Sequence, residues 1–206
     1  MGSRLPQLRR IARGPGENEG PSAAVARFAR AYARCDTLPP MIVVVMGVSG
    51  SGKTTVGRLL AKRLGWVFHE GDEFHSAANI EKMSEGVPLT DGDRWPWLAG
   101  IKEEIARCIE SDSDAVIACS ALRGAYRTFL AAGVPEIRFV YLRGDAPTIL
   151  DRMNTRASHY MKSDMLDSQM VSLEEPEGAI EADIRKPPET IVAEIESRLS
   201  RRQVPT

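Results

Sequence analysis

The residues most clearly suited to chemistry are Gly47-Val48-Ser49-Gly50-Ser51-Gly52-Lys53-Thr54, which match the phosphate-binding pattern G-x-x-x-x-G-K-[ST]. Glycines let the backbone curl so that its N–H groups converge on a phosphate. Lys53 can reach the β- and γ-phosphates, and the Thr54 hydroxyl suits Mg²⁺, which prefers oxygen ligands. The segment, extended to Thr55, therefore predicts a site for a nucleoside triphosphate with magnesium. An ordinary tight turn would explain the glycines but not Lys53-Thr54.

Such a loop requires a buried strand before it and a helix after it. The apolar run 42–46 predicts that strand. The following residues predict the helix, because four apolar residues recur at helical spacing: Val56, Leu59, Leu60 and Leu64. The positive end of this helix adds to the field that attracts phosphate.

A second group of polar residues lies between 69 and 97. Asp72 follows a short predicted strand at 66–68, so it should lie on the same edge of the sheet as the phosphate loop. Three polar residues recur at i, i+4 and i+7 and can share a helix face: His75, Asn79 and Lys82. Together with Arg94, these groups suit a small polyhydroxylated acid. A solvated face with a few ion pairs explains the spacing equally well.

The chain around these groups alternates between strand and helix patterns. Strands are predicted at 42–46, 66–68, 115–119, 137–142 and, more weakly, 179–184. Helices are predicted at 56–64, 79–84, from about 95 (with Pro96 in the first turn) to 109, 146–158, 163–173 and 188–199. This alternation predicts an α/β fold with a parallel sheet, right-handed crossovers and ligands at the carboxyl ends of the strands.

Length and cysteine content restrict the class of protein. The 206 residues fit one domain, and no apolar run approaches the roughly 18 residues that span a bilayer. The three cysteines are Cys35, Cys108 and Cys119, with no C-x-x-C pair. This spacing argues against a disulfide framework or a zinc site and favours a reducing, cytoplasmic location.

Residues 1–40 differ in charge from the rest of the chain. They carry seven arginines and three acids, a net charge of +4, so the remaining residues sum to −5. An acidic body without a basic stripe argues against nucleic acid as a partner. We interpret 1–40 as a disordered N-terminal extension, or as sequence upstream of a start at Met41. An Arg-rich amphipathic segment is also typical of a transit peptide or a surface-binding helix.

Four segments carry a family resemblance. GVSGSGKTT, HEGDEFHSAANIEKMSEGVPLTDGDRWPWL, CSALRGAYR and RASHYMKSDMLDSQMVSLEEP resemble the bacterial-type gluconokinase family in order and spacing, across residues 42–200. The resemblance implies a P-loop NTPase fold like that of shikimate and nucleoside monophosphate kinases, with a five-stranded parallel sheet, flanking helices and a small mobile lid. It also implies ATP-dependent phosphorylation of D-gluconate to 6-phosphogluconate by a homodimer.

The resemblance assigns expected roles by position. ATP and Mg²⁺ are expected on the loop amides, Lys53 and Thr54, and Asp72 is expected to orient, and to be able to deprotonate, the attacking hydroxyl. The expected catalytic residues are Lys53, Asp72 and Arg127. The expected gluconate-binding residues are Asp72, His75, Arg94, Arg123, Arg127 and His159. A surface helix arginine is the alternative interpretation of Arg127.

A lid is expected at about 152–165 within a kinase domain that spans 41–206. Arg152 and Arg156 are four residues apart on a predicted helix, where like charges repel unless an anion lies between them. ATP would supply that anion, and closure of the lid would exclude water from the γ-phosphate.

The sequence also departs from the family pattern. Arg123-Gly124-Ala125 stands where a lysine followed by another basic residue is usual, and 177–181 is a few residues short. Glu181-Ala182 replaces an apolar strand core, which predicts a short fifth strand and leaves the choice of base open. No Asp ends the third strand, so Mg²⁺ would depend on Thr54, phosphates and water, with Asp72 as a further candidate that acts through water.

Two other classes stay open on the residues alone. The first is a kinase of the same fold that acts on shikimate, adenylylsulfate or a nucleotide. The segment 69–97, with His75 and Arg94, argues against it. The second is a nucleotide-gated switch, which would be expected to carry a base-specific motif such as N-K-x-D; the sequence contains none.

Overall fold

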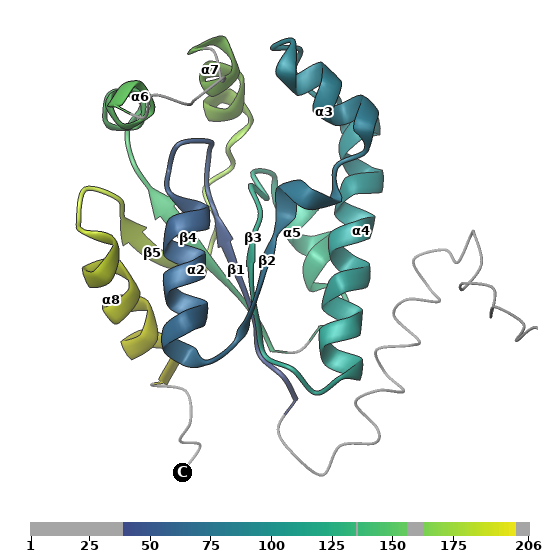
Figure 1. Ribbon diagram of the computed structural model, residues 1–206, viewed down its shortest axis with the longest axis vertical. Coiled ribbons are helices and arrows are strands. Elements are labelled where there is room, and N and C mark those ends of the chain that lie inside the picture. The colour runs from purple at the N-terminus through teal and green to yellow at the C-terminus, as the bar shows by residue number, and fades with distance from the viewer. Residues whose placement is uncertain (1–38, 135, 156–162, 201–206) are drawn as a thin grey trace, which may run out of the picture.

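The computed structural model describes residues 39–134, 136–155 and 163–200. Its centre is a five-stranded parallel sheet with the strand order β2-β3-β1-β4-β5 (Figure 1). The strands are β1 (Ile42–Met46), β2 (Val67–Glu70), β3 (Ala115–Ala118), β4 (Ile137–Arg143) and β5 (Ile180–Asp183). The predicted α/β fold with five parallel strands is therefore confirmed.

Strand β1 lies at the middle of the sheet because it is apolar on both faces. All five of its residues are buried. It pairs in parallel with β3 and β4, with Ile42 opposite Ala115 on one side and Ile137 on the other. A strand of Ile, Val and Met that is covered on both faces is typical of a parallel sheet.

Two helical layers cover the sheet. Helices α4 (Asp91–Glu110) and α5 (Gly124–Ala131) pack on one face, in a core that includes Val44. Helices α2 (Lys53–Leu64) and α8 (Pro188–Ser200) pack on the other face, in a core that includes Val43 and Val45 (Figure 1). Alternate residues of β1 thus enter different cores, as the period of a strand requires.

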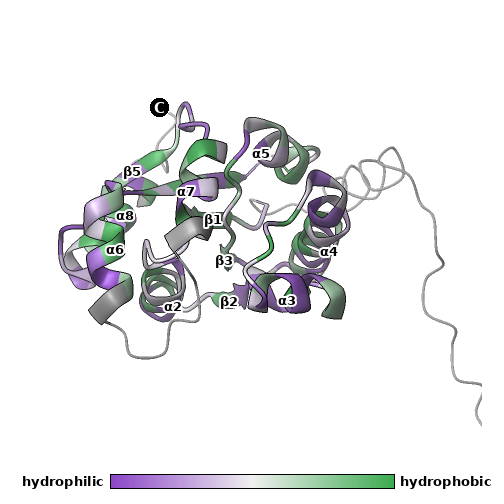
Figure 2. Ribbon diagram, turned by 90° about the horizontal axis from the view of Figure 1, so that it is seen from above, coloured by the Kyte–Doolittle hydropathy of each residue, from purple (hydrophilic) through white to green (hydrophobic). Residues whose placement is uncertain are grey.

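The remaining elements lie at the carboxyl edge of the sheet. They are the short helix η1 (Gly71–Phe74), α3 (Ala77–Ser84), α6 (Ala146–Thr155) and α7 (Ser163–Ser172). Figure 2 looks onto this edge and shows α3 and α7 on opposite sides of the end of β1. The phosphate loop and the segment 69–97 therefore meet at this edge, next to α6 and α7 from later in the chain.

Helix α4 begins earlier than the expected start near Trp95. Thr90 caps it: the Thr90 side chain accepts a hydrogen bond from the Asp93 N–H, and the Asp93 side chain accepts one from the Thr90 N–H. This capping box satisfies two amides at once and fixes the start at Asp91. Pro96 consequently lies in the second turn, and the expectation that it lies in the first turn was wrong.

Other boundaries differ by a few residues. Strand β2 extends to Glu70 instead of ending at Phe68, and β5 covers four residues, shorter than 179–184. Helix α5 was not predicted, because it is short and Arg123 at its N-cap makes no side-chain capping bond. No helix in the described part of the chain combines the length and apolarity needed to cross a membrane.

Candidate active site

The phosphate loop connects the central strand to α2. Gly47, Gly50 and Gly52 have φ angles of +144°, +79° and +99°, which side-chain-bearing residues rarely adopt. A Cβ atom on Gly50 would lie 2.7 Å from Cγ of Met153 on α6, so packing also requires glycine there. Gly52 caps α2 without a side-chain bond, and the first turn of α2 has no acidic residue. Its first amides are therefore available to an anion.

Lys53 lies at the start of α2 and turns back towards the loop. Its Nζ donates a hydrogen bond of 3.1 Å to the carbonyl of Val48. Burial lowers the pKa of the Lys53 ammonium, while the carboxylates of Asp72 and Glu70 act in the opposite direction. A phosphate beside Lys53 would likewise favour its charged form.

Glu70 is a site residue that sequence reasoning missed. It ends β2, and its carboxylate accepts a hydrogen bond from the side chain of Thr54. Burial raises the pKa of Glu70, against the influence of Thr54 and of the nearby cations. Its position at the carboxyl end of a strand beside the phosphate loop was the available signal. Thr54, Glu70 and the nearby Asp72 form a set of oxygen donors that suits Mg²⁺.

A cavity of about 80 Å³ lies next to the phosphate loop, on the side where the acceptor is expected. It brings together five of the predicted residues: Ser49, Lys53, Asp72, His75 and Arg94. Trp97, Tyr126 and Gln169 also line it, and no role had been predicted for them. Typical ligand pockets measure about 300–1,000 Å³, so this cavity is narrow in the described conformation.

His75 is held in place by neighbours from two elements. Its ring stacks on Trp97 with 4.5 Å between centroids, and Trp97 Nε1 donates a 2.7 Å hydrogen bond to the carbonyl of Gly71. Burial lowers the pKa of His75, although Asp72 opposes this, so the ring is neutral at pH 7. His75 Nδ1 lies 3.4 Å from Nδ2 of Asn79; with Nδ1 as the acceptor of that bond, Nε2 is the donor.

The predicted helix face of His75, Asn79 and Lys82 does not form. His75 follows η1 and precedes α3, so it is not on that helix. Buried Asn79 donates to the carbonyl of Asp93, and Lys82 forms a 2.7 Å ion pair with the Asp93 carboxylate. Asn79 and Lys82 therefore hold α3 against the start of α4.

The structure does not bring Arg123 and Arg127 to the cavity. Arg123 Nη1 donates to Asp91 at 2.6 Å, and Arg127 Nη1 donates to the carbonyls of Ala121 and Leu122. Arg127 faces a separate depression that Glu174 also lines. Each guanidinium is bonded to its own surroundings in this conformation. The expected contact of both arginines with the substrate stays a prediction.

Gln169 on α7 connects the lid side of the molecule to the phosphate loop. Its Oε1 accepts a 2.7 Å hydrogen bond from the Ser49 N–H. Gln169 therefore occupies one of the amides that the motif assigns to a phosphate. No local motif signals this contact, since the two residues are 120 positions apart.

The expected lid is only partly described. Arg152 on α6 donates a hydrogen bond to the carbonyl of Ile184, and Met153 next to it packs on the phosphate loop. Arg156 and His159 lie outside the described residues. The expected pairing of Arg152 with Arg156 is therefore not tested.

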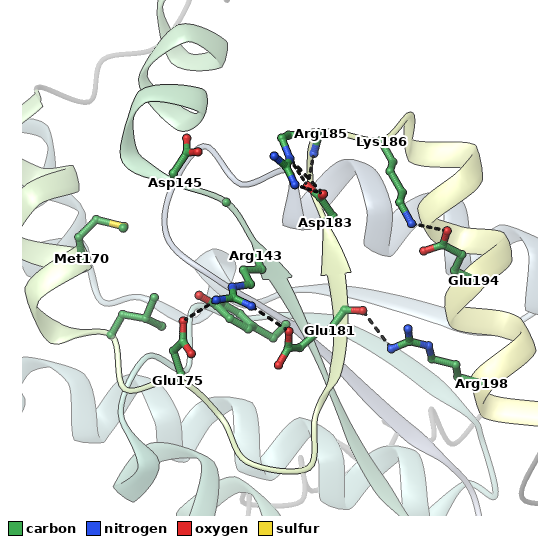
Figure 3. A pocket seen from close by; sticks show the side chains of 13 residues that line it. Arg143, Asp145, Met170, Glu175, Glu181, Asp183, Arg185, Lys186, Glu194 and Arg198 are labelled. Atoms are coloured by element: carbon green, nitrogen blue, oxygen red, sulfur yellow. Dashed lines mark hydrogen bonds and ion pairs between the residues drawn. The ribbon is translucent and has the colours of Figure 1, made fainter.

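A larger open trough of about 620 Å³ runs along β4 and β5 (Figure 3). Its charged side chains pair with one another: Arg143 with Glu175 and Glu181, Arg185 with Asp183, and Lys186 with Glu194. Four basic and five acidic residues line it, so it has no excess positive charge for a triphosphate. The smaller cavity beside Lys53 is the better candidate site.

A phosphate loop on the central strand, facing a cavity with carboxylate, imidazole and guanidinium groups, defines a P-loop kinase for a small polar acceptor. A family model described as an AAA domain matches residues 43–177. A gluconokinase of Gluconobacter oxydans is 44% identical over 161 residues, which cover 77% of this chain and 90% of that protein.

Solved structures agree with this assignment. The crystal structure of a gluconokinase from Sinorhizobium meliloti is 43% identical, with a TM-score of 0.73, and the match covers 80% of this chain and 94% of that one. A shikimate kinase of Aquifex aeolicus shares only the fold, with 20% identity, a TM-score of 0.52 and coverage of 81% and 100%. The chain belongs to the gluconokinase family.

Proposed function

We propose that the protein transfers the γ-phosphoryl group of ATP to D-gluconate and forms 6-phospho-D-gluconate. The observation that carries this proposal is that Lys53 lines the same cavity as Asp72, His75 and Arg94. Groups proposed for the donor and for the acceptor thus line one cavity. The similarity to gluconokinases supports the choice of acceptor.

The nucleotide half consists of the phosphate loop and the start of α2. The amides of residues 47–55 and the Lys53 ammonium would hold the phosphates. Mg²⁺ would bind at Thr54, with Glu70 and Asp72 close enough to act through water, and would neutralise charge on the phosphates. The donor set fits, since all three side chains offer oxygen.

The residues of the acceptor half have two roles: one neutralises the charge of the substrate, and the others orient its hydroxyl groups. Arg94 supplies a guanidinium for the gluconate carboxylate, and neutral His75 donates a directed hydrogen bond from Nε2 to a hydroxyl group. Asp72 orients the attacking hydroxyl and accepts its proton. Phosphoryl transfer has a loose transition state, so positioning and charge neutralisation contribute more than proton removal.

Substrate binding requires opening of the cavity. Its described volume is about 80 Å³, and Gln169 holds the Ser49 N–H. Opening would move α7 away from the phosphate loop, and closing over both substrates would then exclude water from the γ-phosphate. Residues 152–165, with Arg152, Arg156 and His159, would form the lid.

Three further properties belong to this proposal. The family resemblance supports a homodimer, and the absence of a C-x-x-C pair supports a cytoplasmic location. The acidic body supports small molecules, not nucleic acid or membrane, as partners.

The test is a coupled assay of ADP release with Mg-ATP and a panel of sugar acids, shikimate and nucleoside monophosphates. We expect turnover with gluconate and little with the other acceptors. Arg94→Ala should raise the KM for gluconate about tenfold or more with a smaller effect on kcat, and Arg94→Lys should fall in between. Well-folded protein without gluconate-dependent turnover would overturn the proposal. Unchanged kinetics of Arg94→Ala would overturn only the substrate-site assignment.

A further inference from the structure

Three side chains that the proposed reaction does not use meet between β2 and α4. The Nε2 atom of His69 lies 3.5 Å from Oε1 of Glu104 and 3.5 Å from Sγ of Cys108. The ligand atoms of the three residues all lie within 4.8 Å of one another. Cys108 is 5% exposed, and the side chains of His69 and Glu104 are 20% and 16% exposed.

We propose that His69, Glu104 and Cys108 bind one Zn²⁺ ion. A tetrahedral zinc ion with ordinary bond lengths would separate sulfur from nitrogen by about 3.6 Å and nitrogen from oxygen by about 3.4 Å. The two separations that involve His69 Nε2, 3.5 Å each, match these values, and the sulfur and oxygen atoms lie within 4.8 Å of each other. Glu104 and Cys108 are four residues apart on α4, so both project from one face of the helix towards His69 on β2.

The donor atoms select the kind of metal. Mg²⁺ and Ca²⁺ take oxygen ligands, whereas a set of imidazole, thiolate and carboxylate suits zinc. Thiolate and carboxylate together offset the charge of a divalent ion, and water would complete four-coordination. Arg107 forms an ion pair with Oε2 of Glu104, which leaves Oε1 directed towards His69. Such an outer partner is typical of metal ligands.

This inference revises the expectation from cysteine spacing. That expectation considered ligands that are close in sequence, whereas His69 and Cys108 are 39 residues apart and meet only in the fold. The ion would fasten the edge strand β2, which pairs with β3 alone, to α4. Because β2 leads into Asp72 and α4 carries Arg94, zinc would stabilise the acceptor half without entering the reaction.

Cobalt(II) provides the direct test, because it takes tetrahedral zinc sites and a cobalt–thiolate bond absorbs in the near ultraviolet. The full chain, without a histidine tag and with excess Mg²⁺, should bind one equivalent and show this band. Cys108→Ser should abolish the band, and His69→Gln and Glu104→Gln should weaken binding tenfold or more. Cys119→Ala and Cys35→Ser are the matched controls and should keep it.

Thermal unfolding gives the second readout. Zinc should raise the melting temperature of the native chain and of Cys119→Ala, since an ion that binds only the folded state stabilises it. The melting temperatures of Cys108→Ser and Glu104→Gln should not rise with zinc. If Cys108→Ser does not fold, the measurement on Glu104→Gln decides. A native chain without the cobalt band, or a band that persists in Cys108→Ser, would overturn the proposal and leave only a hydrogen-bonded ion pair.

Discussion

At the scale of single residues, Lys53 links the phosphate loop to the proposed acceptor cavity. It belongs to the phosphate loop, lines the acceptor cavity and interacts with Asp72. Burial lowers the pKa of its ammonium, and the anionic groups around it act in the opposite direction. A phosphoryl group passing from donor to acceptor would remain within reach of this one cation.

We therefore expect Lys53→Ala to reduce kcat about a thousandfold or more, because charge stabilisation in an enclosed site is large. The measurement is steady-state ADP release at saturating gluconate. Lys62→Ala, on the exposed last turn of the same helix, is the control and should retain full activity. If Lys53→Ala kept a tenth of the activity, the central role of this lysine would be refuted.

Gln169 offers a second prediction at this scale. Gln169→Ala frees the Ser49 N–H, so ATP should bind between about twofold and tenfold more tightly, the range that one hydrogen bond supports. Gln169→Glu keeps an acceptor and adds a negative charge, so it should bind ATP more weakly.

Calorimetry with a non-hydrolysable ATP analogue measures both variants. Weaker binding by Gln169→Ala would contradict the idea that Gln169 competes with the nucleotide. It would indicate instead that the side chain contacts bound ATP.

At the scale of elements, the start of α4 sets the geometry of the acceptor half. Asp93 accepts from the N–H and hydroxyl of Thr90 and pairs with Lys82 of α3. These partners hold the pKa of the Asp93 carboxyl at about 2, against an ordinary value of 3.8. One carboxylate thus caps α4 and anchors α3, and Arg94 is the next residue along the chain.

This pKa gives a prediction with a definite sign. Because the folded-state pKa lies below the unfolded one, the contribution of Asp93 to stability is complete above pH 3.8 and is lost as the pH falls through about 2. Asp93→Asn should therefore show a shallower loss of stability between pH 4 and pH 2 than the native chain. Urea unfolding across this range measures it. Parallel curves would show that the carboxylate contributes nothing through this contact.

Sequence patterns predicted the elements that carry strong periodicity. The strand at 42–46 and the phosphate loop follow from local rules, and the structure agrees with both. The start of α4 was missed because Asp93 takes the place of the usual Glu or Gln in its capping box. Arg127 and Gln169 could not be placed from sequence patterns. Only the fold determines that the Arg127 guanidinium donates to the Leu122 carbonyl and that Gln169 accepts from the distant Ser49 N–H.

At the scale of the whole molecule, the described body begins just before β1. The Met41 N–H donates a 2.7 Å hydrogen bond to Asp114, and the family model matches from residue 43. We expect deletion of residues 1–40 to leave kcat and both KM values unchanged. A shorter deletion of residues 1–30 is the control. Loss of activity by folded protein in the longer deletion alone would show that residues 31–40 take part in function.

The strand order has a consequence for how this enzyme family can diversify. The phosphate loop follows the central strand β1, whereas Asp72 and His75 follow the edge strand β2, with β3 between them. Mutations between 73 and 97 would therefore change the proposed acceptor pocket and leave the phosphate loop on the central strand unchanged. A gene duplicate would be free to acquire a new sugar acid without first losing its use of ATP. Laboratory evolution should be directed to the same window.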